Sequence, residues 1–227
     1  MREPNVFAKN LGTYGYIIDR EDEAEEFIAW HEGYRNTFKT RTEGLTDDEK
    51  PRVYLARANK IYRAVASGSR IGQALVLAGG YNIVDQIVGP DHPKYGTITI
   101  DLDPEWVVEQ NPDYIFVYEY HPGIFNGYET DDPSGVVAAI EEIMNRPELA
   151  NINAVKNERV YFMSAYLLGG GGNTIMGTAY MGKMLQPELF TDINPQEIHQ
   201  EFVDKFCHID FDLEEHGVFV YPNLEES

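Results

Sequence analysis

Side chains suited to ligand binding gather in three segments of this 227-residue sequence, each directly after a run of apolar residues. The first segment, residues 57–70, carries amide, hydroxyl and guanidinium groups on Asn59, Tyr62, Arg63, Ser67, Ser69 and Arg70. The second contains Glu119, Tyr120 and His121, and the third, residues 164–173, contains Tyr166 and a run of glycines. Arginine binds anions through its forked donors, and aromatic rings pack on cations. The three segments therefore indicate a site for an anionic or aromatic-rich ligand.

Strands alternating with helices must position these segments. Apolar runs predict strands at 52–56, 114–118 and 159–163, and a short strand or its approach at 97–100. Helices are expected at 71–78, 103–110, 134–145 and 174–185, with a last one opening at Pro195. This order is typical of an α/β fold, a three-layer Rossmann-like arrangement with a mainly parallel sheet. Ligands of such sheets bind beyond the carboxyl ends of the strands, where the three segments fall.

A long helix is expected before this alternation. Residues 21–26 are mostly acidic, basic residues follow at 35–41, and apolar residues between Ala24 and Phe38 recur at spacings of three and four. This polarity suits the helix dipole, so the pattern predicts a helix over residues 21–43 that ends at Gly44. Residues 46–51 are a polar connector and the best candidate for a domain boundary. Residues 1–20 show no clear period.

Composition excludes several classes of protein. The chain has 18 Lys+Arg against 38 Asp+Glu, a net charge of −20, which repels nucleic acid and anionic membrane surfaces. Its single cysteine excludes a disulfide framework or a multi-cysteine metal site within the chain. No apolar run approaches the ~18–20 residues that span a bilayer, and the first residues do not resemble a secretory signal. The sequence is therefore either cytoplasmic or a part from which a leader is missing.

Three further patterns do not support a catalytic, cofactor or metal assignment. The glycine run 169–172 matches neither dinucleotide-binding nor P-loop spacing. The cluster between His208 and His216 has a metal-like composition without helical ligand spacing. No serine lies in a nucleophile elbow, and Cys207 is expected to be a buried apolar residue of the last helix. We expect a protein that is not an enzyme and that holds no cofactor.

Five short segments, in the same order, resemble the class III substrate-binding proteins of ABC importers, the cobalamin and iron-siderophore type. They are residues 51–54, residues 68–83 from Gly-Ser-Arg to Gly-Gly-Tyr-Asn, residues 103–115, residues 152–161 and residues 186–190. The resemblance implies that residues 21–45 are the helix connecting two lobes and that residues 51–227 are the carboxyl-terminal, ligand-binding lobe. Residues 1–20 would then be a remnant of the first lobe, which is otherwise missing.

The resemblance also implies a ligand site and partners. The residues carried over to the cleft are Tyr62, Ser67, Ser69, Arg70, Glu119, Tyr120, His121 and Tyr166. The cargo would be a metal chelate, first of all an iron–siderophore complex, with corrinoid, haem or a molybdate-type oxyanion as other members of the class. Delivery would be to ABC permease subunits in the membrane, outside the cytoplasm, from a periplasmic or lipid-anchored protein. The family's docking glutamate has no match near residues 167–170, which leaves the docking contact unassigned.

Two other interpretations stay open at this point. The first is a cytoplasmic enzyme or chelatase-like protein on a related α/β scaffold, for which a true start at Met1 would speak. The second is a partner-binding module, because an isolated lobe would expose half of a cleft. Self-association of the isolated lobe is expected in that case.

Overall fold

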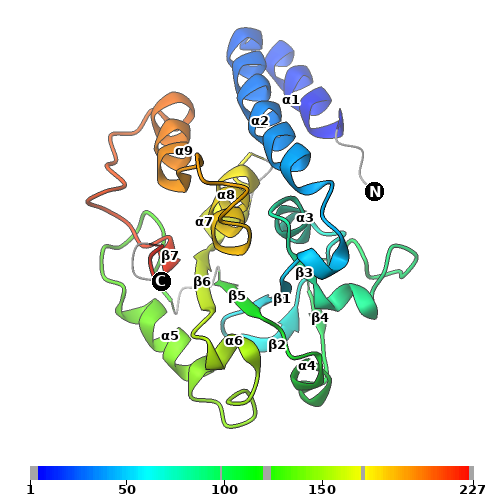
Figure 1. The fold of residues 1–227 in the computed structure, drawn as a ribbon. Helices are drawn as coiled ribbons and strands as arrows, with labels where there is room; N and C mark the ends of the chain where they lie inside the picture. Colours follow the sequence, from blue (N-terminus) through cyan, green and yellow to red (C-terminus); the bar gives the residue numbers. More distant parts are fainter. Residues whose placement is uncertain (1–4, 98, 120–123, 170–171, 225–227) are drawn as a thin grey trace.

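A computed structural model describes the chain except residues 1–4, 98, 120–123, 170–171 and 225–227 (Figure 1). The helices lie at α1 (Asn5–Ile17), α2 (Glu21–Thr42), α3 (Arg70–Leu77), α4 (Pro104–Gln110), α5 (Ser134–Met144), α6 (Asn153–Lys156), α7 (Ala165–Leu168), α8 (Thr174–Leu185) and α9 (Pro195–Phe202). Short 3₁₀ turns lie at Asp47–Glu49 and Ile83–Gln86, and a π turn, Val203–Cys207, extends α9. The strands are β1 (Arg52–Arg57), β2 (Lys60–Ala64), β3 (Tyr81–Asn82), β4 (Ile100–Asp101), β5 (Tyr114–Glu119), β6 (Val160–Ser164) and β7 (Val220–Tyr221).

One sheet runs through residues 52–221, in the strand order β4-β2-β1-β5-β6-β7 with β3 beside β1. Its centre is parallel: β5 pairs with β1 on one side and with β6 on the other. Antiparallel pairs flank this centre, β2 with β1 on one side and β7 with β6 on the other. The predicted α/β class with a mainly parallel sheet is confirmed, and the parallel centre places the carboxyl ends of β1, β5 and β6 at one edge.

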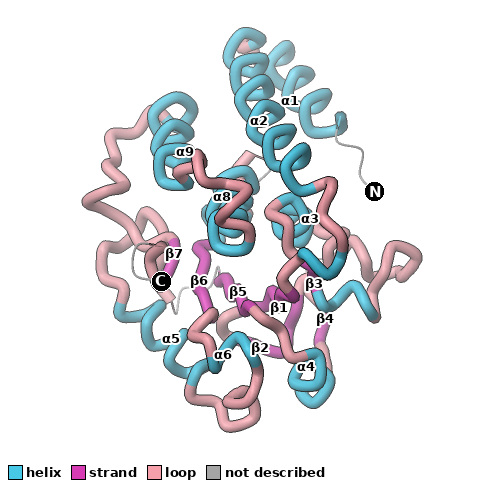
Figure 2. Tube along the Cα trace, in the orientation of Figure 1, coloured by secondary structure: helices cyan, strands magenta, loops and turns pink. Residues whose placement is uncertain are grey.

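Helices cover both faces of the sheet, as Figures 1 and 2 show. Side chains alternate along a strand, so Leu55 and Phe116 point toward α3, α7 and α8, whereas Tyr54 and Val117 point toward α4, α5 and α6. All four are completely buried. Near-continuous apolar strands are what a sheet covered on both faces requires, which explains why these strands were predictable.

The long helix α2 follows the predicted span almost to the residue. It is joined to α9 and its π turn by an aromatic cluster in which Phe27 packs edge-on against Phe206 and stacks on Trp30. Arg41, near its end, donates two hydrogen bonds to the Asp192 carboxylate, at 2.6 and 2.8 Å. These contacts fix α2 to the lobe over most of its length.

Residues 5–17 form a helix that the sequence pattern did not predict. Helix α1 turns back at residues 18–20 and packs along α2, as the two side-by-side blue ribbons of Figure 1 show. Gly15 makes the close approach possible, because a Cβ there would lie 2.6 Å from the Cβ of Ala24. Phe7 then contacts the His31 ring at a centroid distance of 4.6 Å.

Two further expectations were wrong. Residues 57–70 were expected to form a single loop after the strand at 52–56, but residues 60–64 form β2, the second strand of a hairpin with β1. Cys207 is exposed, not buried, and it is the last residue of the π turn that follows α9.

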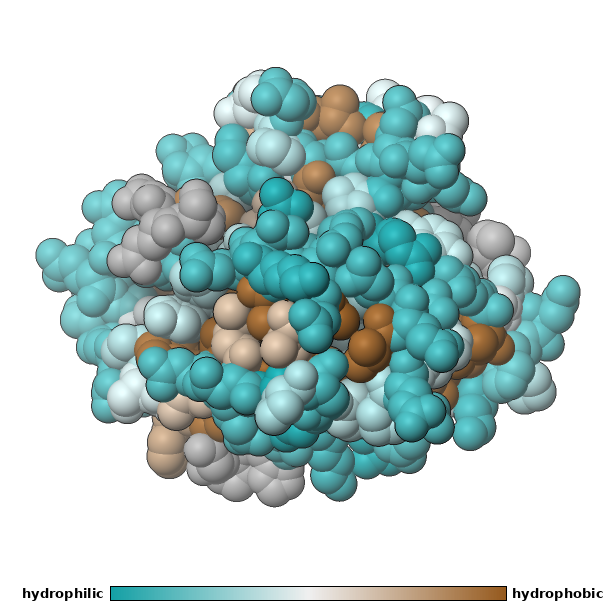
Figure 3. Space-filling model, turned by 60° about the horizontal axis from the view of Figure 1, so that its bottom comes forward, coloured by the Kyte–Doolittle hydropathy of each residue, from teal (hydrophilic) through white to brown (hydrophobic). Residues whose placement is uncertain are grey.

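The outer surface agrees with the acidic composition. Figure 3 shows a mainly hydrophilic face, with apolar residues in small separate patches. Among the described residues, no helix is both long enough and apolar enough to cross a membrane.

Candidate functional site

The carboxyl ends of β1, β5 and β6 bring Arg57, Glu119 and Ser164 to one edge of the sheet. The registers pair Arg57 with Tyr118 across β1 and β5, and Glu119 with Ser164 across β5 and β6. Three polar residues at the ends of three apolar strands are therefore neighbours although they are far apart in the sequence. We call this group the strand-end edge.

Glu119 is completely buried at this edge, and Arg57 forms an ion pair with it. The backbone N–H of Asn59 lies 3.4 Å from the second carboxylate oxygen, and the Arg57 guanidinium also lies over the Tyr118 ring, 5.4 Å from its centroid. A buried carboxylate requires such partners because desolvation of an unpaired charge is costly. Glu119 thus fixes the orientation of an arginine that remains 21% exposed.

Arg57 is the residue of this edge that sequence reasoning missed. In the sequence, Arg57 served only to mark the start of the segment 57–70. It follows one predicted strand directly, as Glu119 follows another, and this similarity could have suggested that the two form an ion pair. That pairing depends on the register between β1 and β5, which is a tertiary property. The sequence shows that both charged residues are present, but it does not show that they lie close together.

The start of α3 holds three predicted site residues. Ser69 caps the helix: its Oγ accepts the Gly72 N–H at 3.1 Å and donates to the Ala66 carbonyl at 2.8 Å. The Ser67 N–H donates to Asp85 Oδ1 at 3.3 Å, and burial raises the pKa of that carboxyl. Both serines are buried, whereas Arg70 is exposed and has no acidic partner at ion-pair distance among the described residues. At this loop, Arg70 is the side chain open to a ligand.

Tyr166 lies in the first turn of α7, directly after β6, and is 39% exposed. Its hydroxyl donates to Glu129 Oε1 at 3.0 Å, and its ring meets Tyr128 edge-on at 5.4 Å. Burial, with a smaller contribution from Glu129, raises the pKa of the Tyr166 hydroxyl.

Hydrogen bonds also fix the backbone around Tyr166. The N–H of Tyr166 bonds to Ser164 Oγ at 3.2 Å, and Ser164 in turn donates to Asn126 Oδ1 at 2.6 Å. Gly127, at a positive φ of 73°, lies under the ring, where a Cβ would be 2.2 Å from Tyr166 Cδ2. Only glycine fits both the backbone and the space.

Arg70 and Tyr166 are on the same face of the sheet. Their helices, α3 and α7, contact each other and contribute to the same buried cluster through Ile71 and Leu167. Each residue is in the first turn of its helix. The structure thus keeps these two predicted ligand residues on neighbouring elements.

Tyr62 is placed elsewhere. Its ring packs against the cluster that β1 forms with α4, α5 and α6, on the opposite face from Tyr166, and its hydroxyl donates to Glu148 Oε1 at 2.8 Å. Arg63, also on β2, pairs with Asp101 at 3.4 Å. The structure does not bring Tyr62 to Tyr166. Tyr120 and His121 lie outside the described residues.

The metal-like carboxyl-terminal cluster does not assemble into a site. His216 pairs with Asp131 through Nδ1 at 3.1 Å. Among the residues that the structure describes, no group of three or more His, Cys, Asp or Glu side chains is placed to hold a metal ion.

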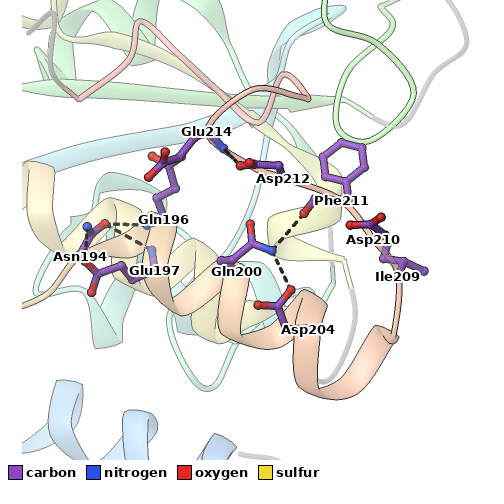
Figure 4. Close-up of a pocket in the computed structure, with 10 residues that line it drawn as sticks. All are labelled: Asn194, Gln196, Glu197, Gln200, Asp204, Ile209, Asp210, Phe211, Asp212 and Glu214. Carbon is purple, nitrogen blue, oxygen red and sulfur yellow. Dashed lines mark hydrogen bonds between the residues drawn. The ribbon is translucent and has the colours of Figure 1, made fainter.

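Two concave regions lie away from the strand-end edge. The smaller one, about 590 Å³, is bounded by α9 and residues 209–214 and is strongly acidic (Figure 4). Gln200 bridges it, donating to Asp204 at 2.8 Å and to the Phe211 carbonyl at 3.0 Å, so the loop is tied to the helix. A larger groove of about 1240 Å³ follows α8, α9 and the last residues. The acidic lining of the smaller region does not suit an anion.

Comparisons with known proteins agree with this architecture. A family model described as periplasmic binding protein matches residues 4–167. Among curated proteins, the molybdate-binding protein MolA of Haemophilus influenzae is 23% identical over 194 residues, which is 84% of this chain and 48% of MolA. The petrobactin-binding protein YclQ of Bacillus subtilis is 25% identical over 168 residues, 73% of this chain and 47% of YclQ. The chain therefore spans about half the length of these relatives.

Solved structures show the same fold. The TroA-like periplasmic binding protein FepB from Veillonella parvula aligns with a TM-score of 0.76 and 21% identity, covering 96% of this chain and 61% of FepB. Molybdate-bound MolA aligns with a TM-score of 0.70 and 19% identity, covering 92% of this chain and 57% of MolA. Because the family model matches well over half of the sequence, the chain belongs to the periplasmic binding protein family.

Proposed function

We propose that this chain is the connecting helix and second lobe of the substrate-binding component of an ABC importer. The supporting observations are the match to the periplasmic binding protein family, the charged side chains of the strand-end edge, and the exposed Arg70 and Tyr166 in the first turns of α3 and α7. In this proposal α2 is the connecting helix and the sheet with its two helical layers is the ligand-binding lobe. The edge holds a cargo without changing it chemically.

The proposed cargo is an anionic metal-containing small molecule, with an iron–siderophore complex first and a molybdate-type oxyanion second. Relatives named for petrobactin and for molybdate both matched. The arginines divide accordingly: Arg57 and Arg63 have acidic partners, whereas Arg70 is exposed without one among the described residues. The Arg70 guanidinium is thus exposed positive charge on a chain of net charge −20, and its forked donors suit the binding of an anion.

The proposed route of delivery is to ABC permease subunits outside the cytoplasm. α2 is fixed to the lobe by its aromatic contacts and by the Arg41–Asp192 pair, which suits a stiff connection and a largely preformed site. A corrinoid or haem would depend more on Tyr166 than on Arg70. These ligands are therefore informative competitors in a binding assay.

The test is calorimetric titration of the two-lobed protein with ferric siderophores, haem, cobalamin and molybdate. Intrinsic tryptophan fluorescence is a poor reporter of ligand binding, because neither tryptophan lies at the proposed site. Trp30 lies in the aromatic cluster between α2 and α9, and Trp106 packs against the core between the sheet and α4, α5 and α6. We expect a dissociation constant of about 1 μM or below for one anionic ligand. Absence of binding by all four classes, or release of a chemically altered ligand, would contradict the proposal.

A further inference from the structure

The larger groove, of about 1240 Å³, reaches the amino ends of β5 and β6 on the side of the sheet that α8 covers. Its lining includes Tyr114 of β5, Tyr161 of β6 and Tyr180 of α8. Arg159, the residue directly before β6, lines it as well. We call Arg159 and these three tyrosines the amino-end site. None of them belongs to the strand-end edge.

Arg159 is a cation without a partner. Of the nine arginines in the described part of the chain, seven donate a hydrogen bond to a protein acceptor or form an ion pair. The two that do neither are Arg70, which the proposed function uses, and Arg159, which it does not. Arg159 is exposed, and its guanidinium lies over the Tyr114 ring, 4.9 Å from the centroid. The ring orients the guanidinium, and the N–H donors stay available.

The Tyr161 hydroxyl is a second group without a partner. The side chain is only 5% exposed, because its ring stacks on Tyr114 at a centroid distance of 6.4 Å and packs on Phe116 at 5.7 Å. No atom of the described residues forms a hydrogen bond with its hydroxyl, and the same holds for Tyr180, whose pKa is raised by burial. Buried polar groups are ordinarily hydrogen-bonded, so a hydroxyl left unpaired in the lining of a groove indicates a partner from outside the chain.

The spacing of these groups indicates the size of that partner. Arg159 and Tyr161 are two residues apart in extended backbone and lie on the same face, so they are separated by about 6–7 Å along the chain. One benzene ring with a polar group at each end has about this length. A carboxylate suits the forked donors of Arg159, a polar group at the far end suits the Tyr161 hydroxyl, and the tyrosine rings supply apolar surface between them.

The acidic residues of the groove do not compete for Arg159. Residues 213–217 lead into β7, which runs antiparallel to β6, so they lie beyond the carboxyl end of β6. Arg159 is at the other end, about five residues or ~16 Å along the strand. That separation exceeds the Debye length of about 8 Å at physiological ionic strength. Asp192, which also lines the groove, accepts two hydrogen bonds from Arg41.

We propose that the amino-end site binds a small aromatic carboxylate, a single ring with a second polar group opposite the carboxylate. The inference goes beyond the proposed function and does not depend on it, because the cargo is assigned to Arg70 at the start of α3. The groove, at about 1240 Å³, is larger than the ~300–1,000 Å³ of typical ligand pockets, so a one-ring ligand fills only the part next to Arg159.

Calorimetric titration of the 227-residue chain with 4-hydroxybenzoate tests the site. We expect a dissociation constant below about 1 mM for this small probe. Arg159→Gln should raise it at least tenfold, because the carboxylate loses its charged donors. Arg70→Gln is the matched control, since it removes the other unpaired arginine, and it should leave the constant within about twofold. Both side chains are exposed, so each variant should melt within about 2 °C of the wild type.

The role of the hydroxyl is tested by changing the protein and the ligand together. Tyr161→Phe should weaken 4-hydroxybenzoate binding about three- to tenfold, and it should leave the binding of benzoate, which lacks the second polar group, within about twofold. The melting temperature should stay within about 2 °C of the wild type, because no atom of the described residues bonds to this hydroxyl. A purely structural hydroxyl would instead weaken both ligands equally and lower the melting temperature.

Four outcomes would overturn the inference. The first is no binding of 4-hydroxybenzoate at millimolar concentration. The second is equal affinity of Arg159→Gln and the wild type, and the third is loss of probe binding in Arg70→Gln, which would place the probe at α3. The fourth is inorganic phosphate binding as tightly as 4-hydroxybenzoate, which would refute an aromatic ligand. Cargo binding by the two-lobed protein is measured separately, so each of these results leaves the proposed function intact.

Discussion

Removal of Arg57 should destabilise the protein strongly, because it breaks the ion pair between that guanidinium and the fully buried Glu119. Breaking one side of a buried pair costs about 3–5 kcal/mol. We take ~3 kcal/mol for Arg57→Met, because Arg57 is 21% exposed and water screens part of the charge. For a domain of this size about 1 kcal/mol shifts the melting temperature by 2–4 °C, so a fall of roughly 6–12 °C is expected.

The measurement is thermal and urea unfolding of the wild type, Arg57→Met and the double variant Arg57→Met/Glu119→Leu. The double variant should recover much of the lost stability, since it removes the buried carboxylate as well and fills the site with apolar atoms. Arg63→Met is the matched control, because its partner Asp101 is 82% exposed and its loss should cost less than about 1 kcal/mol. If the double variant is no more stable than Arg57→Met, the reasoning from a buried ion pair is refuted.

Three further predictions concern backbone strain and pH. Gly127→Ala should cost about 2–4 kcal/mol, since a Cβ at positive φ would overlap the Tyr166 ring; a urea midpoint like that of the wild type would contradict the packing at that turn. The Arg41 guanidinium lowers the pKa of Asp192 to about 2, so this pair contributes stability above pH ~4 that is lost as pH falls toward 2. In Arg41→Met, the urea midpoint should therefore decrease less between pH 4 and pH 2 than it does in the wild type. Burial lowers the pKa of His199 to about 3, so between pH ~6.5 and 3 the unfolded chain binds one more proton than the folded chain. The free energy of unfolding should therefore fall by up to ~1.4 kcal/mol per pH unit on acidification. His199→Gln should remove this contribution to the slope, and an unchanged slope would show that His199 does not titrate in this way.

Much of the fold could be predicted because its strands and helices have strong local signals. The start of α4 is an example: the Asp103 side chain accepts the Glu105 N–H at 2.8 Å, and Pro104 follows at the first helical position, which is a common way for a helix to begin. The apolar runs of β5 and β6 were equally clear.

The elements that the sequence did not reveal depend on tertiary packing. α1 contains Gly12 and Gly15, which weaken a helical pattern, and the helix is stabilised by contact with α2. β2 has only five residues and no regular alternation, since Ile61 and Ala64 are buried and Tyr62 and Arg63 are both half-buried, so the sequence shows no period of two there.

The candidate site divides in the same way. Arg70 and Tyr166 were predicted as ligand residues because strand-end loops of α/β sheets face ligands, and the structure places both in first helical turns on one face. Tyr62 was carried over by sequence position, yet β2 directs it to the opposite layer, where Glu148 binds its hydroxyl. The Arg57–Glu119 pair required the strand register and could not be predicted from the sequence.

The most direct test compares ligand binding by Arg70→Ala and Arg63→Ala in the proposed two-lobed protein. Calorimetry with the anionic ligand that binds best should give a dissociation constant raised at least tenfold by Arg70→Ala, and within about twofold of wild type for Arg63→Ala, whose partner is Asp101. The melting temperature of Arg70→Ala should stay within about 2 °C of the wild type, because the side chain is exposed. Equal affinity of Arg70→Ala and wild type would contradict the claim that Arg70, at the start of α3, holds the cargo.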